Sequence, residues 1–166
     1  VPNEKAIEIW QALLAAGQPF GIRPAGSLTF NVLRIQAGRP GVGRELSTDF
    51  IPLEAGLWDE VSFKKGCYTG QEILARMESR NKLAKTMVTL KLSQMVETPA
   101  ALRLDGKEIG TLTSSVVTPR GEAVGIGFVK VAAAEVGQML TVDDQAISAQ
   151  ILTLAGAQPP VLENRA

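Results

Sequence analysis

The residues with the clearest chemical potential lie around the only cysteine of the chain, just before a predicted helix. They read Lys64-Lys65-Gly66-Cys67-Tyr68-Thr69-Gly70-Gln71-Glu72. The two ammonium groups and the N-terminus of the following helix favour the thiolate of Cys67, which is the nucleophilic and metal-binding form of cysteine. The glycines let backbone amides approach a ligand closely. The alternative is that Cys67 is a small buried hydrophobic residue and that the lysines are solvated.

The sequence contains no histidine, and this excludes several kinds of site. Histidine is the side chain whose ordinary pKa lies near neutrality, so Ser-His-Asp and Cys-His mechanisms cannot be built from this chain. One thiol without imidazoles also cannot supply the ligands of a usual Cys/His zinc site. Carboxylates, lysines and the thiol remain as the groups available for chemistry.

The composition is that of an ordinary soluble globular protein. The chain has 166 residues, of which 45% are hydrophobic and 20% charged, and its 17 basic and 17 acidic residues cancel. This balance gives no overall field toward nucleic acid or anionic lipid. No apolar run approaches the roughly 20 residues that cross a bilayer, and no leader peptide is visible, so we expect a cytoplasmic protein without a membrane partner. Val1 in place of an initiating Met predicts a processed product or a fragment.

Basic residues are concentrated between residues 64 and 85, where six basic residues stand against two acidic ones, a local excess of +4 (six minus two). The basic side chains are Lys64, Lys65, Arg76, Arg80, Lys82 and Lys85. Such a segment could contact tRNA phosphates, but only one aromatic residue, Tyr68, interleaves them. We therefore favour a solvated helix face and treat direct tRNA contact as the lesser hypothesis.

The first half of the chain is predicted to consist of short helices and an irregular loop. Asn3 can cap a helix over residues 4–16, and Ser27 can cap a second helix that ends at Gly38. The glycines and prolines of residues 39–59 favour a long irregular loop, a kind of segment that often carries function. A third helix is expected over residues 69–80.

The second half changes to a period of two, which is typical of strands. Met87 and Thr89 alternate with Val88 and Leu90, as a half-buried strand requires. Further strands are expected over residues 102–104, 109–113, 116–118, 123–129, 139–142 and 146–152. Their short spacing predicts a small antiparallel barrel or sandwich.

The change of pattern near residues 82–86 predicts a domain boundary. We assign residues 1–83 to an α+β segment, residues 84–157 to a C-terminal β-barrel domain and residues 158–166 to a flexible tail.

The cysteine segment carries a family resemblance. Residues 65–72 match the lysine-glycine-cysteine-tyrosine-any-glycine-glutamine-glutamate signature of YgfZ-type folate-binding proteins. Upstream, residues 33–38 (Leu-Arg-Ile-Gln-Ala-Gly) and 52–57 (Pro-Leu-Glu-Ala-Gly-Leu) resemble two blocks of the wider aminomethyltransferase-like GcvT superfamily. Downstream, residues 110–114 and 125–129 resemble strands of that superfamily's C-terminal barrel. The resemblance covers nearly the whole chain.

The resemblance implies a fold class and a division of the chain into two parts. The fold would be α+β: the antiparallel sheet and helices of a truncated GcvT-like folate-binding domain, followed by a small antiparallel Greek-key β-barrel. The family has an N-terminal region that helps to build the folate cavity and that is missing here.

The resemblance also implies a function, namely binding of tetrahydrofolate or a derivative in the assembly or repair of iron-sulfur enzymes, including some that modify tRNA. Cys67 and Lys65 would be the working residues. Cys67 could ligate a transient iron-sulfur cluster, or act as a nucleophile or redox thiol. A lone thiolate supplies one cluster ligand, so iron-sulfur assembly proteins or client enzymes would supply others.

The resemblance assigns the cofactor contacts to Arg34, Gln36, Glu54, Tyr68, Gly70, Gln71 and Glu72. Gln36 departs from the family pattern, because superfamily members carry a glutamate there that can grip the pterin; the neutral amide loses the charge-assisted bond. Arg34 could hold the folate tail or pair with a neighbouring acid. Glu54 could orient a ligand or cap loop amides, and Tyr68 could stack on a ring or fill the core.

Three functions remain open at this point. The first is a folate-dependent maturation factor that is not itself an enzyme, which the cysteine signature favours. The second is a folate-dependent aminomethyltransferase of the glycine cleavage type. The third is a nucleic-acid-binding barrel, which salt-dependent RNA affinity would reveal.

Overall fold

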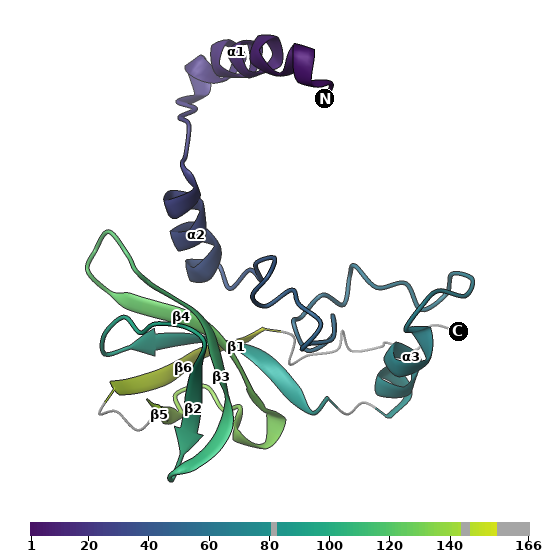
Figure 1. Ribbon diagram of the computed structural model, residues 1–166, viewed down its shortest axis with the longest axis vertical. Helices are drawn as coiled ribbons and strands as arrows, with labels where there is room; N and C mark the ends of the chain where they lie inside the picture. Colours follow the sequence, from purple (N-terminus) through teal and green to yellow (C-terminus); the bar gives the residue numbers. More distant parts are fainter. Residues whose placement is uncertain (81–82, 144–146, 156–166) are drawn as a thin grey trace. The chain divides into compact units, whose positions relative to one another are not determined.

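The first unit of the fold is Val1–Phe30, and it follows the helical pattern at the start of the chain (Figure 1). The computed structural model describes residues 1–80, 83–143 and 147–155. A 3-10 turn, Asn3–Lys5, leads into α1, Ala6–Gly17, close to the predicted helix over residues 4–16. A second 3-10 turn, Gln18–Phe20, follows.

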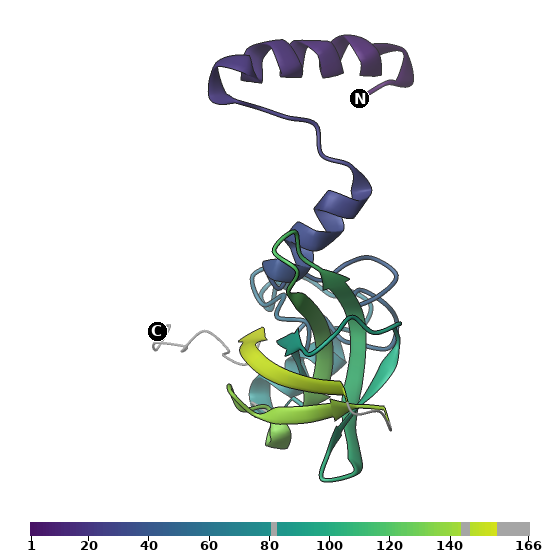
Figure 2. The ribbon, with the colours of Figure 1, turned by 90° about the vertical axis from the view of Figure 1, so that its left-hand side faces the viewer.

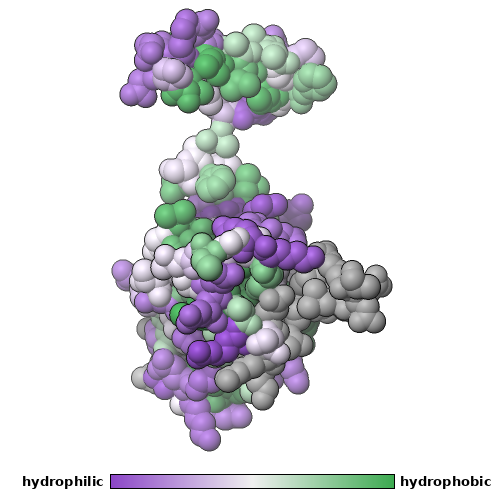
Figure 3. Space-filling view, turned by 90° about the vertical axis from the view of Figure 1, so that its right-hand side faces the viewer, coloured by the Kyte–Doolittle hydropathy of each residue, from purple (hydrophilic) through white to green (hydrophobic). Residues whose placement is uncertain are grey.

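Apolar side chains of this first unit remain exposed. Ile7 is 73% exposed and Trp10 52%, and Figure 3 shows such side chains as green surface on the unit. None of the residues of α1 is buried. The pattern of α1 therefore forms the helix without giving the unit a core of its own.

The second unit, Asn31–Ala166, holds the barrel and the loop segments that lead to it. Helix α2, Ser27–Gln36, runs across the boundary between the units, and α3, Gln71–Arg80, precedes the barrel. Between them, frequent glycines and prolines break up regular structure, as predicted. In residues 1–80 the strand component is limited to one isolated bridge between Val42 and Leu46.

Six antiparallel strands close into a barrel in the order β1-β4-β3-β2-β5-β6 (Figures 1 and 2). They are β1 (Lys85–Leu92), β2 (Ala100–Leu104), β3 (Lys107–Val117), β4 (Ala123–Lys130), β5 (Met139–Val142) and β6 (Ile147–Ala155). The strands β2, β3 and β4 form a meander whose last strand, β4, pairs with β1, the strand that precedes the meander in the chain; this is a Greek-key arrangement. The predicted mixed class and the small antiparallel barrel are confirmed.

One strand prediction is wrong. Residues 109–113 and 116–118 were expected to be separate strands, whereas β3 continues through 11 residues from Lys107 to Val117. The pairing register with β4 shifts between Leu112 and Ser114, which keeps the strand paired across its polar middle. The polar residues in the middle of β3 therefore do not interrupt the strand.

The barrel separates two apolar clusters. The inner cluster takes alternate residues of all six strands, including Val88, Leu90, Leu102, Leu112, Val142 and Ile151. The outer cluster joins Ile35 and Ala55 to the outward side of the barrel at Met87, Ile126 and Phe128. Met87 is 1% exposed, so β1 is buried on both sides at its start rather than half-buried as its alternation predicts.

The loop before the barrel is held against this outer face. The rings of Phe50 and Phe128 stack with centroids 3.6 Å apart and planes 5° from parallel. The Met87 N–H donates to the carbonyl of Glu54 at 2.9 Å. The loop over residues 39–59 is thus irregular in backbone but packed on the barrel.

The predicted tail, residues 158–166, lies outside the described residues, and the domain boundary near residues 82–86 stays a prediction. Among the helices that the structure describes, none has the length and apolar character needed to cross a membrane.

Candidate functional site

A buried ion pair connects the end of α2 with the loop that follows it. The guanidinium of Arg34 donates from Nη1 to Oε2 of Glu45 at 2.9 Å. Arg34 is 7% exposed and Glu45 1%. Burial of two charges is tolerated only when hydrogen bonds satisfy their remaining polar atoms, so the surroundings of this pair decide its role.

Hydroxyl groups from the barrel complete the pair. The Oγ atoms of Thr113 and Ser114 each lie 2.6 Å from Oε1 of Glu45. Nη2 of Arg34 donates to the Ser114 Oγ at 2.8 Å, and the Gly41 N–H donates to Oε2 of Glu45 at 2.8 Å. These four side chains, Arg34, Glu45, Thr113 and Ser114, form a polar network between α2, the loop and β3.

Gly41 is needed for the closeness of this packing. A Cβ atom at Gly41 would lie 2.7 Å from Cζ of Arg34. The absence of a side chain at Gly41 therefore leaves room for the guanidinium, and any side chain there would displace it.

Gln36 lies at the last turn of α2, beside this network. The Gly38 N–H donates to the Ile35 carbonyl at 3.0 Å, and the Arg39 N–H donates to the Arg34 carbonyl at 2.8 Å. Gly38 has a φ of +63°, so the turn is a Schellman cap with glycine in the left-handed position. The side chain of Gln36 is exposed on this capped turn.

Glu54 is buried but serves the backbone. Its Oε1 accepts a hydrogen bond from the Lys85 N–H at 3.2 Å, and its Oε2 accepts one from the Ile51 N–H at 3.3 Å. Of the two alternatives that the sequence left open, the observed geometry is that of a carboxylate capping amides. It fastens the loop to the start of β1.

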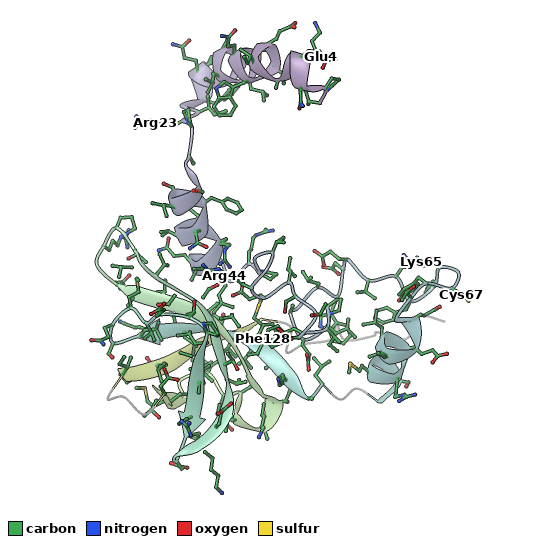
Figure 4. The ribbon with its side chains drawn as sticks, in the orientation of Figure 1. Glu4, Arg23, Arg44, Lys65, Cys67 and Phe128 are labelled. Atoms are coloured by element: carbon green, nitrogen blue, oxygen red, sulfur yellow. The ribbon has the colours of Figure 1, made fainter. Side chains whose placement is uncertain are left out.

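The thiol of Cys67 is exposed, so the alternative of a small buried hydrophobic residue is wrong. Nζ of Lys65 lies 4.6 Å from the centroid of the Tyr68 ring, a cation-π contact. The Tyr68 hydroxyl donates to the Ser62 carbonyl at 3.1 Å, and the Lys65 N–H donates to Oγ of Ser62 at 3.2 Å. Lys65 and Cys67 lie together on the turn before α3 (Figure 4).

Gly70 forms the start of α3. Its φ is +86°, and its carbonyl accepts from the N–H groups of Ile73 and Leu74 at 3.2 and 3.3 Å. The helix begins at Gln71, two residues after the predicted start at Thr69. Gln71 is half-buried and Glu72 is exposed in the first turn.

The predicted site residues fall into separate groups. Arg34 and Glu54 are each engaged in internal contacts, whereas Lys65 and Tyr68 contact each other. In the described ranges, no hydrogen bond or ion pair joins the Cys67 turn to Gln36 or Arg34. A cavity of about 460 Å³ lies at the β1–β2 connection, lined by residues 94–99, Asp143 and Ile147, and includes none of the predicted residues.

Residues of the network other than Arg34 were missed by sequence reasoning. Glu45 lies in a glycine-rich loop without periodicity, Thr113 ends a predicted strand, and Ser114 falls in the gap between two predicted strands. A hydroxyl on a strand that bonds to a carboxylate 68 or 69 residues away leaves no pattern in the sequence around either residue. Within the part of the chain that the structure describes, no group of three or more His, Cys, Asp or Glu side chains could hold a metal ion.

Comparison with known proteins agrees with this architecture. The GCVT N-terminal domain matches residues 1–65. A chloroplastic protein of Arabidopsis thaliana, whose name assigns it provisionally to the transferases, is 39% identical over 93% of this chain and 36% of its own length. An aminomethyltransferase of Caldanaerobacter subterraneus is 30% identical over 86% of this chain and 38% of its own length.

The fold is also similar to a solved structure. The glycine cleavage system aminomethyltransferase T of Bartonella henselae aligns with a TM-score of 0.77 and 22% identity, over 94% of this chain and 45% of that chain. The chain thus spans less than half the length of these relatives. The domain match over residues 1–65 and the aminomethyltransferase relatives are similarities to the GcvT-like superfamily, and the solved structure shows that the fold is shared.

Proposed function

We propose that the chain contributes part of a tetrahydrofolate-binding site in a protein of the GcvT-like superfamily. The observation that carries the proposal is the exposed side chain of Gln36 on a capped helix end that is anchored to the barrel. The position lies in the block that resembles the pterin-binding block of the superfamily. When bound, tetrahydrofolate supplies a carrier for one-carbon groups.

The residues of this chain fit such a ligand in part. The amide of Gln36 can accept one hydrogen bond from a pterin N–H and donate another. Arg34 and Glu54 do not fit as direct ligands, because both residues are buried and their polar atoms hold internal hydrogen bonds. One face of the Tyr68 ring is occupied by the Lys65 ammonium, so the opposite face would be the one to stack on a ligand.

Cys67 carries the finer part of the proposal, a role in the assembly or repair of iron-sulfur enzymes. Its support is the YgfZ-type signature over residues 65–72 together with the exposure of the thiol. The thiolate would supply one ligand to a transient cluster, and iron-sulfur assembly proteins or client enzymes would supply the rest. Any effect on tRNA would pass through those enzymes, and the proposed compartment is the cytoplasm.

A second candidate is a folate-dependent aminomethyltransferase. It is favoured by the names of curated relatives, among them the aminomethyltransferases of Caldanaerobacter subterraneus and Halothermothrix orenii, at 30% and 31% identity. In that case Cys67 would not take part in the reaction.

The test is anaerobic calorimetry with tetrahydrofolate on the gene product that carries this sequence, wild type and Cys67→Ala. We expect both proteins to bind the ligand, and only the wild type to support activity of iron-sulfur client enzymes. Aminomethyl transfer by both proteins would favour the second candidate. Absence of binding by the wild type would end the folate proposal.

Gln36 allows a sharper test of the folate contact. Gln36→Glu restores a carboxylate that can make charge-assisted bonds to the pterin N–H donors, so we expect tetrahydrofolate affinity to rise about fivefold, corresponding to roughly 1 kcal/mol. Gln36→Ala removes the contact and is expected to lower affinity by a similar factor. Equal affinity of all three proteins would remove Gln36 from the site.

A further inference from the structure

The buried network of Arg34, Glu45, Thr113 and Ser114 lies directly beside the helix end that presents Gln36. The backbone carbonyl of Arg34 accepts one of the two hydrogen bonds of the Schellman cap, while its side chain reaches into the network. Gln36 therefore sits two residues beyond the anchored residue, inside the same capped turn. Its neighbour Ile35 packs into the outer apolar cluster of the barrel.

The guanidinium of Arg34 bonds to four parts of the fold at once. Nε donates to Oδ1 of Asn31 at 2.8 Å, one turn earlier in α2. Nη1 donates to the Arg39 carbonyl at 3.3 Å, just after the cap, and to Glu45 in the loop. Nη2 donates to Ser114 on β3. Because the guanidinium is planar and rigid, these bonds fix the helix end, the chain after it and the barrel relative to one another.

Glu45 is the common partner that holds this arrangement together. Its two oxygens accept hydrogen bonds from Arg34, the Gly41 N–H, Thr113 and Ser114. The side chain is fully buried. Both oxygens are occupied and solvent does not reach them, so the carboxylate cannot touch a ligand. Glu45 can therefore affect a site only through the groups to which it is hydrogen-bonded.

We propose that Glu45 is a positioning residue. Through Arg34 it holds the capped end of α2, and therefore the side chain of Gln36, in register with β3 of the barrel. The proposal rests on the proposed function in one respect, that Gln36 contacts the pterin. It adds that the geometry of this contact is set by a charged group that never meets the ligand.

Two variants and a matched control separate positioning from loss of stability. Ser114→Ala removes one hydroxyl that bonds to both Arg34 and Glu45, and Glu45→Gln keeps the shape of the side chain but removes its charge. The control is Thr118→Ala, which also removes a buried barrel hydroxyl but one that bonds to the Glu122 N–H in the β3–β4 hairpin. If Glu45→Gln fails to fold, Ser114→Ala still decides the proposal.

The first measurement is amide hydrogen exchange at Gly38 and Arg39, whose N–H groups form the cap. We expect exchange at these two amides to rise at least about tenfold in Ser114→Ala and Glu45→Gln, relative to Thr118→Ala. Unchanged exchange, or an equal rise in the control, would overturn the proposal whatever the ligand.

The second measurement is tetrahydrofolate affinity of the same proteins, in the gene product that carries this sequence and at a temperature where all of them are folded. We expect a loss of up to about fivefold in Ser114→Ala and Glu45→Gln, no larger than the loss in Gln36→Ala, and unchanged affinity in Thr118→Ala. Faster exchange with unchanged affinity would show that the cap is anchored without positioning the ligand, which would overturn the proposal. A wild type that does not bind tetrahydrofolate would overturn the proposed function and the ligand part of this proposal together. The exchange measurement needs no ligand, so it would still show whether Glu45 anchors the cap.

Discussion

At the scale of single residues, the same kinds of side chain do different work in different places. Glu45 is buried against Arg34, whereas Asp49, four residues later, is exposed and accepts a hydrogen bond from the Ser47 hydroxyl at 3.3 Å. Cys67 is exposed although free cysteine is among the more buried residue types. Burial and partners, more than residue type, decide which of these groups contributes to stability and which is open to reagents.

Loss of the Glu45 charge should be costly. Glu45→Gln leaves the Arg34 guanidinium buried without its counter-charge, and we expect the free energy of unfolding to fall by about 3–5 kcal/mol. Urea unfolding followed by circular dichroism measures the change. Asp49→Asn in the same loop is the control and should change stability by less than about 0.5 kcal/mol. Similar values for the two variants would contradict the importance of the buried pair.

The thiol of Cys67 should react in the folded protein. Because the side chain is exposed, we expect one equivalent of a maleimide reagent to label the native chain without denaturant, and none to label Cys67→Ala. Mass spectrometry of the intact protein counts the label. A requirement for denaturant would mean that the turn before α3 covers the thiol in solution.

At the scale of elements, glycines mark the places where segments come into close contact. A Cβ atom at Gly127 of β4 would lie 2.6 Å from the Thr111 carbonyl oxygen of β3. At Gly41, the approach is to the guanidinium of Arg34. In both cases an atom of a neighbouring element occupies the space that a side chain would need.

Adding one methyl group at such a contact should destabilise the barrel. We expect Gly127→Ala to lower the free energy of unfolding by about 1–3 kcal/mol, because the backbone of β3 must move away. Gly66→Ala is the control, since nothing lies within 4 Å of a Cβ atom there. Thermal melts of both variants make the comparison, and an unperturbed melt for Gly127→Ala would contradict the close strand packing.

At the scale of the whole molecule, the barrel depends on the segment before it. The outer cluster puts Ile35 and Ala55 over Met87, Ile126 and Phe128. The helices of the first unit, by contrast, contain no buried residue. Stability of the barrel should therefore depend on residues 31–58 and little on residues 1–30.

Truncation tests this dependence and also the predicted boundary near residues 82–86. A fragment beginning at Asn31 should keep the melting temperature of the full chain. A fragment beginning at residue 84 exposes the outer cluster and should lose on the order of 1.5–3 kcal/mol for each large apolar side chain uncovered. Chemical unfolding of the two fragments gives the difference. Equal stability would support residues 84–157 as an independent domain.

Much of the fold could be predicted because its signals are local. The apolar spacing and glycines define α1 and α2, and period-two alternation with an Asp-Gly turn defines the strands around residues 100–110. The cysteine segment was also recognisable, because its residue types and spacing are contiguous. These features depend on neighbours within a few positions, which is the range over which a pattern can be read.

Tertiary structure decided the rest, because the deciding partners lie far apart in the sequence. Glu45 lies 69 residues from Ser114, and Arg34 lies 80 residues from it, so no local pattern marks their network. Met87 is covered by segments from outside its strand, and β3 passes through its polar middle because Ser114 finds buried partners there. The sequence alone determined most of the elements and the residues of the thiol signature. The approach of loop, helix and barrel determined which polar residues are held inside, and the structure showed that the thiol is exposed.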